Sequence, residues 1–519
     1  MGFRFQKTVS RHWLYYLIQF TIKTDSSHKT ILKATSVFGF SQVLKILVGL
    51  VGSKFIAIFL GTSGIGIVGL LQNTLAIITS ITGFGINISG VRMVALAKAQ
   101  KDEVLFSKTV LVLKRWSIAT GILGVLITFL LAKPLSIWTF NSTEYINWFL
   151  ILSVNFIFSS LAVNKMVLLQ GTRSMKAIAV STVVYAVFVT LISVPIYYFF
   201  RVNGIVAVLV ITALLNFIIN WFFARKIQVV PVSVSFKETI SKGKEMIQLG
   251  FLLSINVIFG QITAYLLKLY FNFQDTSESV LGLYIVATTL LLTYVGMVFS
   301  AMSTDFYPRL TEVQSDNRQV KELVNDQLEI GLLLITPLII VFYLFAPLII
   351  TVLYSTEFLN VVVILKWALF AIIIKAVIWP LAFIILAKGE KKLYFKQEIL
   401  GDAMNIGFTI LGYQYFGLIG IGLAMAFNYV VYGVYVYYVV RNKFSFSFRK
   451  NTIGIIVKSS ILGILAGLTV SFLEYPNAYW ILAILSILAV YSSYIDLNKR
   501  IDLNEYVKKI IAKFKGSKP

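Results

Sequence analysis

The sequence predicts an all-α integral membrane protein, and three observations carry that prediction. Only 13% of its 519 residues are charged and 58% are hydrophobic, whereas about a quarter of a soluble domain is charged. Apolar stretches of about 20 residues, the length that spans a bilayer, recur from residue 37 to residue 495. These stretches are continuous rather than alternating, which favours helices over a β-barrel.

The breaks between the apolar stretches divide the chain into about 14 membrane-spanning helices. The second of these spans is long enough to require tilt or a cytoplasmic extension. The expected outer loops are only a few residues long, as at 61–64 and 201–203, which leaves no room there for a catalytic domain. The predicted spans are residues 37–60, 65–97, 112–132, 145–168, 177–200, 204–224, 246–271, 280–307, 328–354, 360–387, 394–414, 417–440, 452–473 and 478–495.

The loops alternate in charge, and this alternation predicts an orientation. Every second loop is rich in Lys and Arg, and the loops between them hold little beyond Lys133 and Arg201. Basic loops stay in the cytoplasm, so we expect both termini there. The N-terminal extension, residues 1–33, contains the short apolar block 13–20, which we interpret as an interfacial helix. The tail, residues 497–519, is interpreted as a basic amphipathic helix on anionic lipid.

Composition also excludes several kinds of site. The chain has no cysteine and only two histidines, His12 and His28, so a metal centre built on either residue type is not expected. No G-x-x-x-x-G-K-[ST] phosphate loop is present. The net charge of +24 would suggest nucleic acid in a soluble protein, but in this chain cytoplasmic loops account for it. We therefore expect no cofactor, no metal and no nucleic-acid partner.

Three glycine landmarks recur at a nearly constant spacing. Gly66 and Gly282, and likewise Gly204 and Gly420, are 216 positions apart, and Gly171 and Gly389 are 218 apart. The spacing predicts two six-helix bundles with a pseudo-twofold axis along the membrane normal. The expected parts are an N-lobe (34–225), a cytoplasmic linker (226–245), a C-lobe (246–441) and two further C-terminal helices (442–496).

At this point the chain resembles a known family. The Gly-Thr-Ser-Gly-Ile-Gly turn at 61–66, the turns at Gly171 and Gly389, and the 14-span plan are similar to the MOP exporter superfamily. The stretch 45–54, with Phe-Gly-Ile-Asn at 84–87 and Gly-Val-Arg at 90–92, resembles its polysaccharide-transporter branch, and most of all the Wzx-type O-antigen flippases. The resemblance covers roughly residues 34–441. Many relatives stop after twelve spans, so the last two helices and the N-terminal extension depart from that pattern.

The resemblance implies a flippase rather than an enzyme. Such proteins move a polyprenyl-pyrophosphate-linked oligosaccharide, such as an O-antigen repeat unit for lipopolysaccharide, across the bacterial inner membrane by alternating access. Membrane lipids and other polysaccharide-assembly proteins are the partners it implies. Three alternatives stay open: a MATE-like exporter of small molecules, a flippase of a peptidoglycan lipid precursor, and a membrane-embedded polysaccharide polymerase or ligase.

Positive side chains inside the spans are the candidate binding residues. A charge at mid-bilayer costs about 3 kcal/mol on insertion scales, so these groups must be hydrated, paired or snorkelling. A hydrated set facing a lumen would suit a pyrophosphate cargo. We expect such a cationic lumen from Lys45, Lys54, Arg92, Lys268 and Lys375, with Lys366 as a further cation in the same span as Lys375.

Acids in the spans are fewer. Glu398 and Asp402 lie one turn apart on one helix face, and Asp305 lies near the end of an earlier span. One hypothesis makes them a site for H⁺ or Na⁺ coupling, and the other makes them structural, for instance through an Asp402–Lys375 ion pair. The amides of Asn405 and Asn428 and the aromatic run from Tyr429 have two interpretations as well: contacts to sugar, or helix packing.

Overall fold

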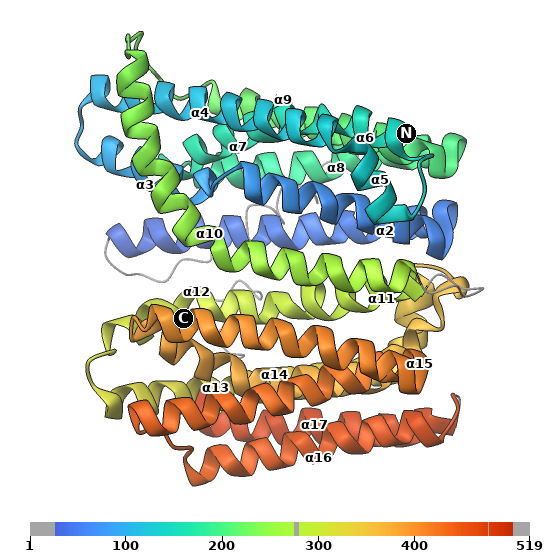
Figure 1. Cartoon of the computed structure of the whole chain (residues 1–519). Helices are drawn as coiled ribbons and strands as arrows, with labels where there is room; N and C mark the ends of the chain where they lie inside the picture. The colour runs from blue at the N-terminus through green and yellow to red at the C-terminus, as the bar shows by residue number, and fades with distance from the viewer. Residues whose placement is uncertain (1–25, 274–279, 476, 502–519) are drawn as a thin grey trace, which may run out of the picture. The chain divides into compact units, whose positions relative to one another are not determined.

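The computed structural model is built from helices (Figure 1) and describes residues 26–273, 280–475 and 477–501. Within these ranges, ten helical segments are long and apolar enough to cross a membrane. Some of the ten contain a turn: Gly61 breaks α2 (Ser26–Thr82), and Gly417 breaks α15 (Lys391–Phe444). The protein is therefore a multi-pass membrane protein, and the count of 14 spans stays a prediction. The predicted interfacial helix at 13–20 and most of the basic tail lie outside the described residues.

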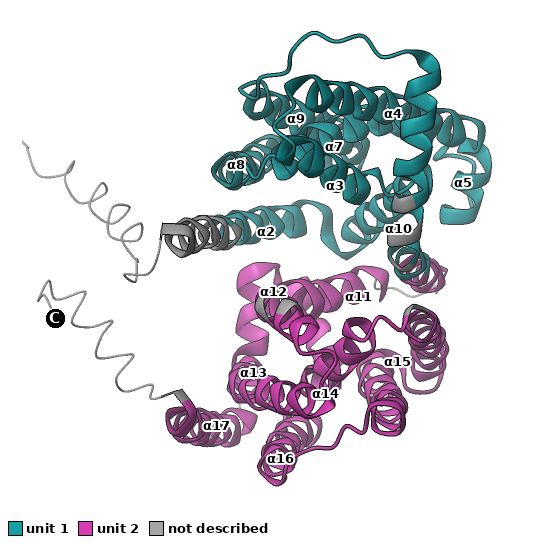
Figure 2. Ribbon diagram, turned by 90° about the vertical axis from the view of Figure 1, so that its left-hand side faces the viewer, with its two compact units in different colours: residues 1–262 teal, residues 263–519 magenta. Residues whose placement is uncertain are grey.

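The chain forms two compact units, residues 1–262 and 263–519 (Figure 2). The boundary falls inside α10 (Phe236–Asn272), which is a single continuous helix. Residues 228–235, in the predicted linker, have no regular structure, whereas residues 236–245 already belong to α10. The lobe boundaries drawn from the sequence repeat stay predictions.

The first unit packs its helices closely through small residues. Gly52 of α2 faces Thr190 of α8, and Gly171 of α7 faces Val94 of α3. One apolar core includes Leu71, Phe149 and Ile205, all nearly fully buried. Besides α2 and α10, the elements are α3 (Ile86–Ala99), α4 (Glu103–Leu130), α5 (Ala132–Phe140), α6 (Ile146–Ser153), α7 (Asn155–Gly171), α8 (Met175–Phe200), the 3₁₀ turn η1 (Arg201–Gly204) and α9 (Ile205–Ala224).

The prediction of one long helix over residues 65–97 is wrong. The structure ends α2 at Thr82 and begins α3 at Ile86, and Phe84 and Gly85 between them have φ of 47° and 66°. A Cβ on Gly85 would lie 2.1 Å from the carbonyl oxygen of Gly250 in α10. The turn is thus a place where two backbones meet, which requires glycine on both sides.

The second unit surrounds α14 with the other helices (Figure 2). Its core includes Phe306, Leu328, Ile384 and Val436. Gly422 of α15 lets that helix approach α14, because a Cβ there would meet the Ile364 carbonyl oxygen at 2.2 Å. The elements are α11 (Val280–Thr288), the π-helical segment η2 (Thr289–Val295), α12 (Gly296–Glu312), α13 (Asn317–Leu353), η3 (Thr356–Phe358), α14 (Val361–Ala387), α15, α16 (Lys450–Phe472) and α17 (Asn477–Ile501).

Left-handed turns recur at the spacing of the sequence repeat. Arg173 and Gly389 have φ of 54° and 73°, and they are 216 positions apart. Arg201 (φ 51°, ψ −132°) and Gly417 (φ 62°, ψ −142°) are also 216 apart and share one backbone conformation. The recurrence of unusual backbone at equal intervals supports an internal repeat.

A buried ion pair joins the C-terminal helices to the rest of the second unit. Glu329 of α13 is 4% exposed, and its Oε2 accepts from Arg500 Nε of α17 at 2.8 Å. Its Oε1 accepts from the Thr452 hydroxyl of α16 at 2.6 Å. One carboxylate thus binds both α16 and α17 to α13.

Candidate functional site

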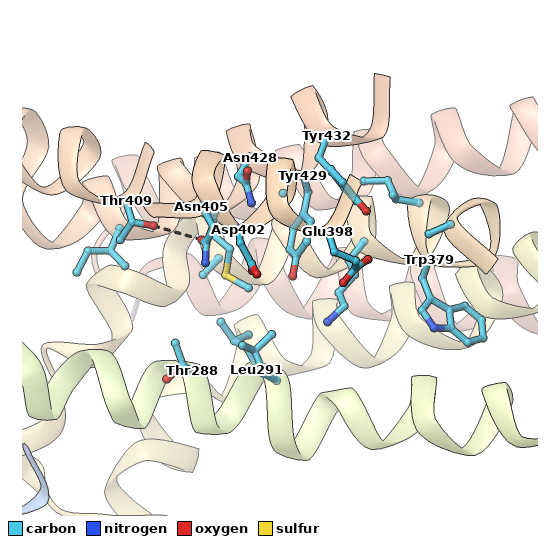
Figure 3. Close-up of a pocket in the computed structure, with 18 of the residues that line it drawn as sticks. Thr288, Leu291, Trp379, Glu398, Asp402, Asn405, Thr409, Asn428, Tyr429 and Tyr432 are labelled. Atoms are coloured by element: carbon cyan, nitrogen blue, oxygen red, sulfur yellow. Dashed lines mark hydrogen bonds between the residues drawn. The ribbon is translucent and has the colours of Figure 1, made fainter. Parts of the chain in front are cut away.

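The second unit contains a cavity of about 420 Å³, shown in Figure 3. Residues of α11, η2, α14 and α15 line it. The wall from α15 is formed by both of its arms, since Gly417 turns the helix back on itself and a Cβ on Gly412 would meet the Gly420 carbonyl oxygen at 2.5 Å. The cavity therefore lies between helices of the second unit that are long and apolar enough to span a membrane.

Three charged side chains line this cavity: Lys375 from α14, and Glu398 and Asp402 from α15. All three are half-buried. The Lys375 ammonium lies 5.5 Å from the ring centre of Phe299 and 5.9 Å from that of Tyr429, close enough for cation–π attraction. Within the described part of the chain, no ion pair of 4.0 Å or less joins Lys375 to either carboxyl group. The Asp402–Lys375 pair considered from the sequence is therefore not formed, although the two residues share one cavity.

Neutral polar groups extend the site along α15. Asn405 and Thr409 are joined by a hydrogen bond of 3.4 Å from the Thr409 hydroxyl to Asn405 Oδ1 (Figure 3). Asn428, on the second arm, is 8% exposed, and its Oδ1 has no hydrogen-bond partner within the structure. A buried amide oxygen without a donor is costly, so a bound water or ligand is expected to complete it.

Aromatic side chains and a helix irregularity form the remaining wall. Leu291 and Leu292 belong to the π-helical segment, Thr288 directly precedes it, and all three line the cavity. In Figure 3, Thr288 and Leu291 lie opposite the labelled polar residues of α15. Single π-helical turns occur often at functional sites, and no sequence signal pointed to this one. The aromatic lining residues are Tyr284, Trp379, Phe383, Tyr394, Tyr429 and Tyr432.

The other predicted site residues lie elsewhere. Lys45 and Arg92 are exposed, on α2 and α3. Lys54 (α2), Lys268 (α10) and Lys366 (α14) are half-buried. None of these five residues lines the cavity that contains Lys375. Asp305 lies in α12, and its side chain is outside the described part of the structure.

This arrangement suits a polar ligand in an apolar bundle. One cation, two carboxyl groups and several amides and hydroxyls converge where the surrounding helices are apolar. Charges inside a membrane span face the bundle interior or water, and they mark pathways for substrate or ions. The fold is that of a multi-pass membrane protein, and the cavity places charged and polar groups inside one of its helical units.

Comparison with known proteins shows the family of the chain. The chain matches the model of a family described as polysaccharide biosynthesis protein over residues 55–363. The protein belongs to this family. No curated protein sequence matches the chain significantly.

Solved structures establish the fold. The inward closed form of the lipid II flippase MurJ superposes with a TM-score of 0.65 at 14% identity, over 90% of this chain and 99% of that one. An inward-facing multidrug resistance MATE transporter of the MOP superfamily gives 0.62 at 13% identity, over 77% and 94%. The Vibrio cholerae MATE transporter VcmN, in a mutant form, gives 0.54 at 15% identity, over 80% and 97%. The chain shares its fold with these three proteins.

Proposed function

We propose that this protein is a flippase for a polyprenyl-pyrophosphate-linked oligosaccharide and works by alternating access. The observation that carries the proposal is the cavity holding Lys375, Glu398 and Asp402 within the apolar bundle of a polysaccharide biosynthesis protein. An O-antigen-type repeat unit is the cargo we infer. We place the protein in the bacterial cytoplasmic membrane with both termini in the cytoplasm.

The site chemistry supports a cargo that is both anionic and sugar-bearing. A lysine ammonium is a mobile point charge that holds phosphate and releases it. Among the described residues Lys375 has no close carboxylate partner, so its ammonium remains available for an anion. Tyr429 and Tyr432 present aromatic surface beside it, and rings of this kind offer large apolar area with a polar hydroxyl.

Energy for transport is proposed to come from an ion gradient. Asp402 and Glu398 lie one helical turn apart and face the same cavity. Carboxyl oxygens bind H⁺ and Na⁺, and neither of these two is held by an ion pair within the described residues. Occupation of the site by an ion would neutralise charge that is otherwise costly inside the bilayer.

Reconstitution tests the cargo. The full chain is placed in vesicles that contain a fluorescent polyprenyl-pyrophosphate oligosaccharide in both leaflets, and a membrane-impermeant quencher is added outside. A flippase exposes all of the label to the quencher, whereas protein-free vesicles keep about half protected. If the protected half persists with protein present, both without a gradient and with an imposed H⁺ or Na⁺ gradient, the proposal is wrong.

The alternatives give different results in parallel vesicles. Scrambling of lipid II but not of the oligosaccharide lipid would assign the protein to peptidoglycan precursors. Uptake of a small organic cation alone would indicate a MATE-like exporter. An increase in oligosaccharide length would indicate a polymerase.

A further inference from the structure

The first unit contains a second cavity, of about 130 Å³, whose lining differs in kind from the one above. No Asp, Glu, Lys or Arg is among its lining residues. Hydroxyl side chains dominate instead, and they come from the end of α2, from α4, α7 and α10. They are Thr79, Ser80, Thr82, Ser117, Thr120, Ser159, Ser160 and Ser254.

Four of these eight hydroxyl groups can only accept hydrogen bonds from a ligand. Each hydroxyl has one proton, and four of those protons are already used. Thr82 and Thr120 donate to the carbonyl oxygens of Ile78 (2.8 Å) and Ser117 (3.0 Å). Ser160 donates to the Ile157 carbonyl at 3.0 Å, and Ser159 donates to Asn155 Oδ1 at 2.8 Å. A ligand can therefore bind these four oxygens only by supplying donors.

Ser117 is a further polar group of this cavity, and it can donate to a ligand or accept from it. Its side chain lines the cavity and is 2% exposed, yet its Oγ has no hydrogen-bond partner within the structure. Buried hydroxyl groups are normally paired. Phe156 adds an apolar wall, held against α4 because Gly124 leaves room for its ring.

The lining also discriminates against charged ligands. Phosphate and carboxylate are acceptor-rich anions, so they would face acceptor oxygens with no cation to balance them. A metal cation would find oxygens but no carboxylate. An uncharged polyol supplies donors without charge, and its ring has apolar faces.

We propose that this cavity is a binding subsite for an uncharged sugar ring of the cargo. The inference rests on the proposed function for the identity of that cargo. This subsite differs in chemistry from the cavity at Lys375, because no Asp, Glu, Lys or Arg lines it.

Photolabelling of the full chain tests the subsite without requiring transport. The probe is an alkyl glucoside carrying a diazirine on the sugar, used in detergent that has no sugar headgroup. We expect labelled peptides that contain Ser117 or Ser160. Methyl glucoside should compete with the probe, and glucose 1-phosphate should not.

Substitution separates binding from packing. Ser117→Ala should weaken competition by methyl glucoside about three- to tenfold, the effect of one neutral hydrogen bond. The same change should leave the melting temperature of the ligand-free protein unchanged or higher, because it removes an unpaired buried hydroxyl. Ser181→Ala is the matched control. Ser181 is 1% exposed and its hydroxyl donates to the Ile178 carbonyl oxygen, but it does not line the cavity.

Three results would overturn the subsite. One is labelling that methyl glucoside does not reduce, and another is labelling of the second unit's cavity alone. The third is equal competition by methyl glucoside in Ser117→Ala and wild-type protein, which would show that the sugar binds without Ser117. Loss of flipping in vesicles with this labelling intact would reject the proposed function but not the sugar site.

Discussion

Glu329 provides the sharpest test of how α16 and α17 are attached. Its Oε2 lies 2.7 Å from Arg500 Nη2, and the two side chains are 5% and 26% exposed. Two unit charges at that separation attract by about 6 kcal/mol at an effective dielectric of ~20. Desolvation offsets part of this, and breaking a buried pair costs about 3–5 kcal/mol. Because water reaches part of Arg500, we expect Glu329→Gln to lower the free energy of unfolding by about 3 kcal/mol.

The assay is equilibrium unfolding in mixed micelles with increasing dodecyl sulfate, followed by proteolysis of α16–α17. Arg500→Gln and the double variant complete a thermodynamic cycle, and we expect a coupling energy of at least about 2 kcal/mol. The exposed Arg318–Glu322 pair, at 87% and 56% exposure, is the control, and its loss should cost under about 0.5 kcal/mol. A Glu329→Gln effect that is no larger than the control, with no coupling, would refute this account.

Three further predictions follow from particular residues. Gly85→Ala should destabilise the first unit by about 2 kcal/mol or more, because it adds left-handed strain and a contact with Gly250; thermal unfolding measures this, with Gly454→Ala, which meets no neighbour, as a control expected to change little. Backbone N–H groups of Arg318 and Gln319 donate to Asp316 and lower the pKa of its carboxyl group below 3.8. The stabilisation of the first turn of α13 is therefore full above that value and lost as pH falls through the lowered pKa. Hydrogen exchange should show this loss in wild-type protein, and an identical pH profile in Asp316→Ala would contradict it. Asp402→Asn should abolish the dependence of flipping on an imposed H⁺ or Na⁺ gradient, and unchanged dependence would leave Asp402 a structural residue.

The sequence was sufficient to predict a helical membrane protein, because a helix that crosses lipid must be long and apolar. Such apolar stretches can be counted directly in the sequence. It also located the turns at Gly61 and Gly417, where short polar or glycine-containing breaks interrupt hydropathy. The break at Gly85 was missed because it lies inside an apolar run. Only the contact with Gly250, 165 positions away, explains it.

The candidate site could be predicted in part. Spacing alone placed Glu398 and Asp402 on one face, and the structure adds Lys375 to the same cavity. Hydropathy cannot tell which way a lysine on a membrane helix points, so the directions of Lys45, Lys54 and Arg92 were not predictable. The π-helical segment contacts α14 beside the cavity, and no pattern in its own residues predicted it.

The central claim is that Lys375 binds the anionic headgroup during flipping. The most direct measurement is the flipping rate of the oligosaccharide lipid in vesicles for wild type, Lys375→Gln and Lys458→Gln. Lys458 is the control because it pairs with Asp496 at 2.7 Å, away from the cavity. Loss of one charge-assisted contact of about 1.5–3 kcal/mol predicts a rate roughly 10- to 100-fold lower for Lys375→Gln, with Lys458→Gln near wild type. Equal rates for Lys375→Gln and wild type, with both proteins folded, would contradict the account.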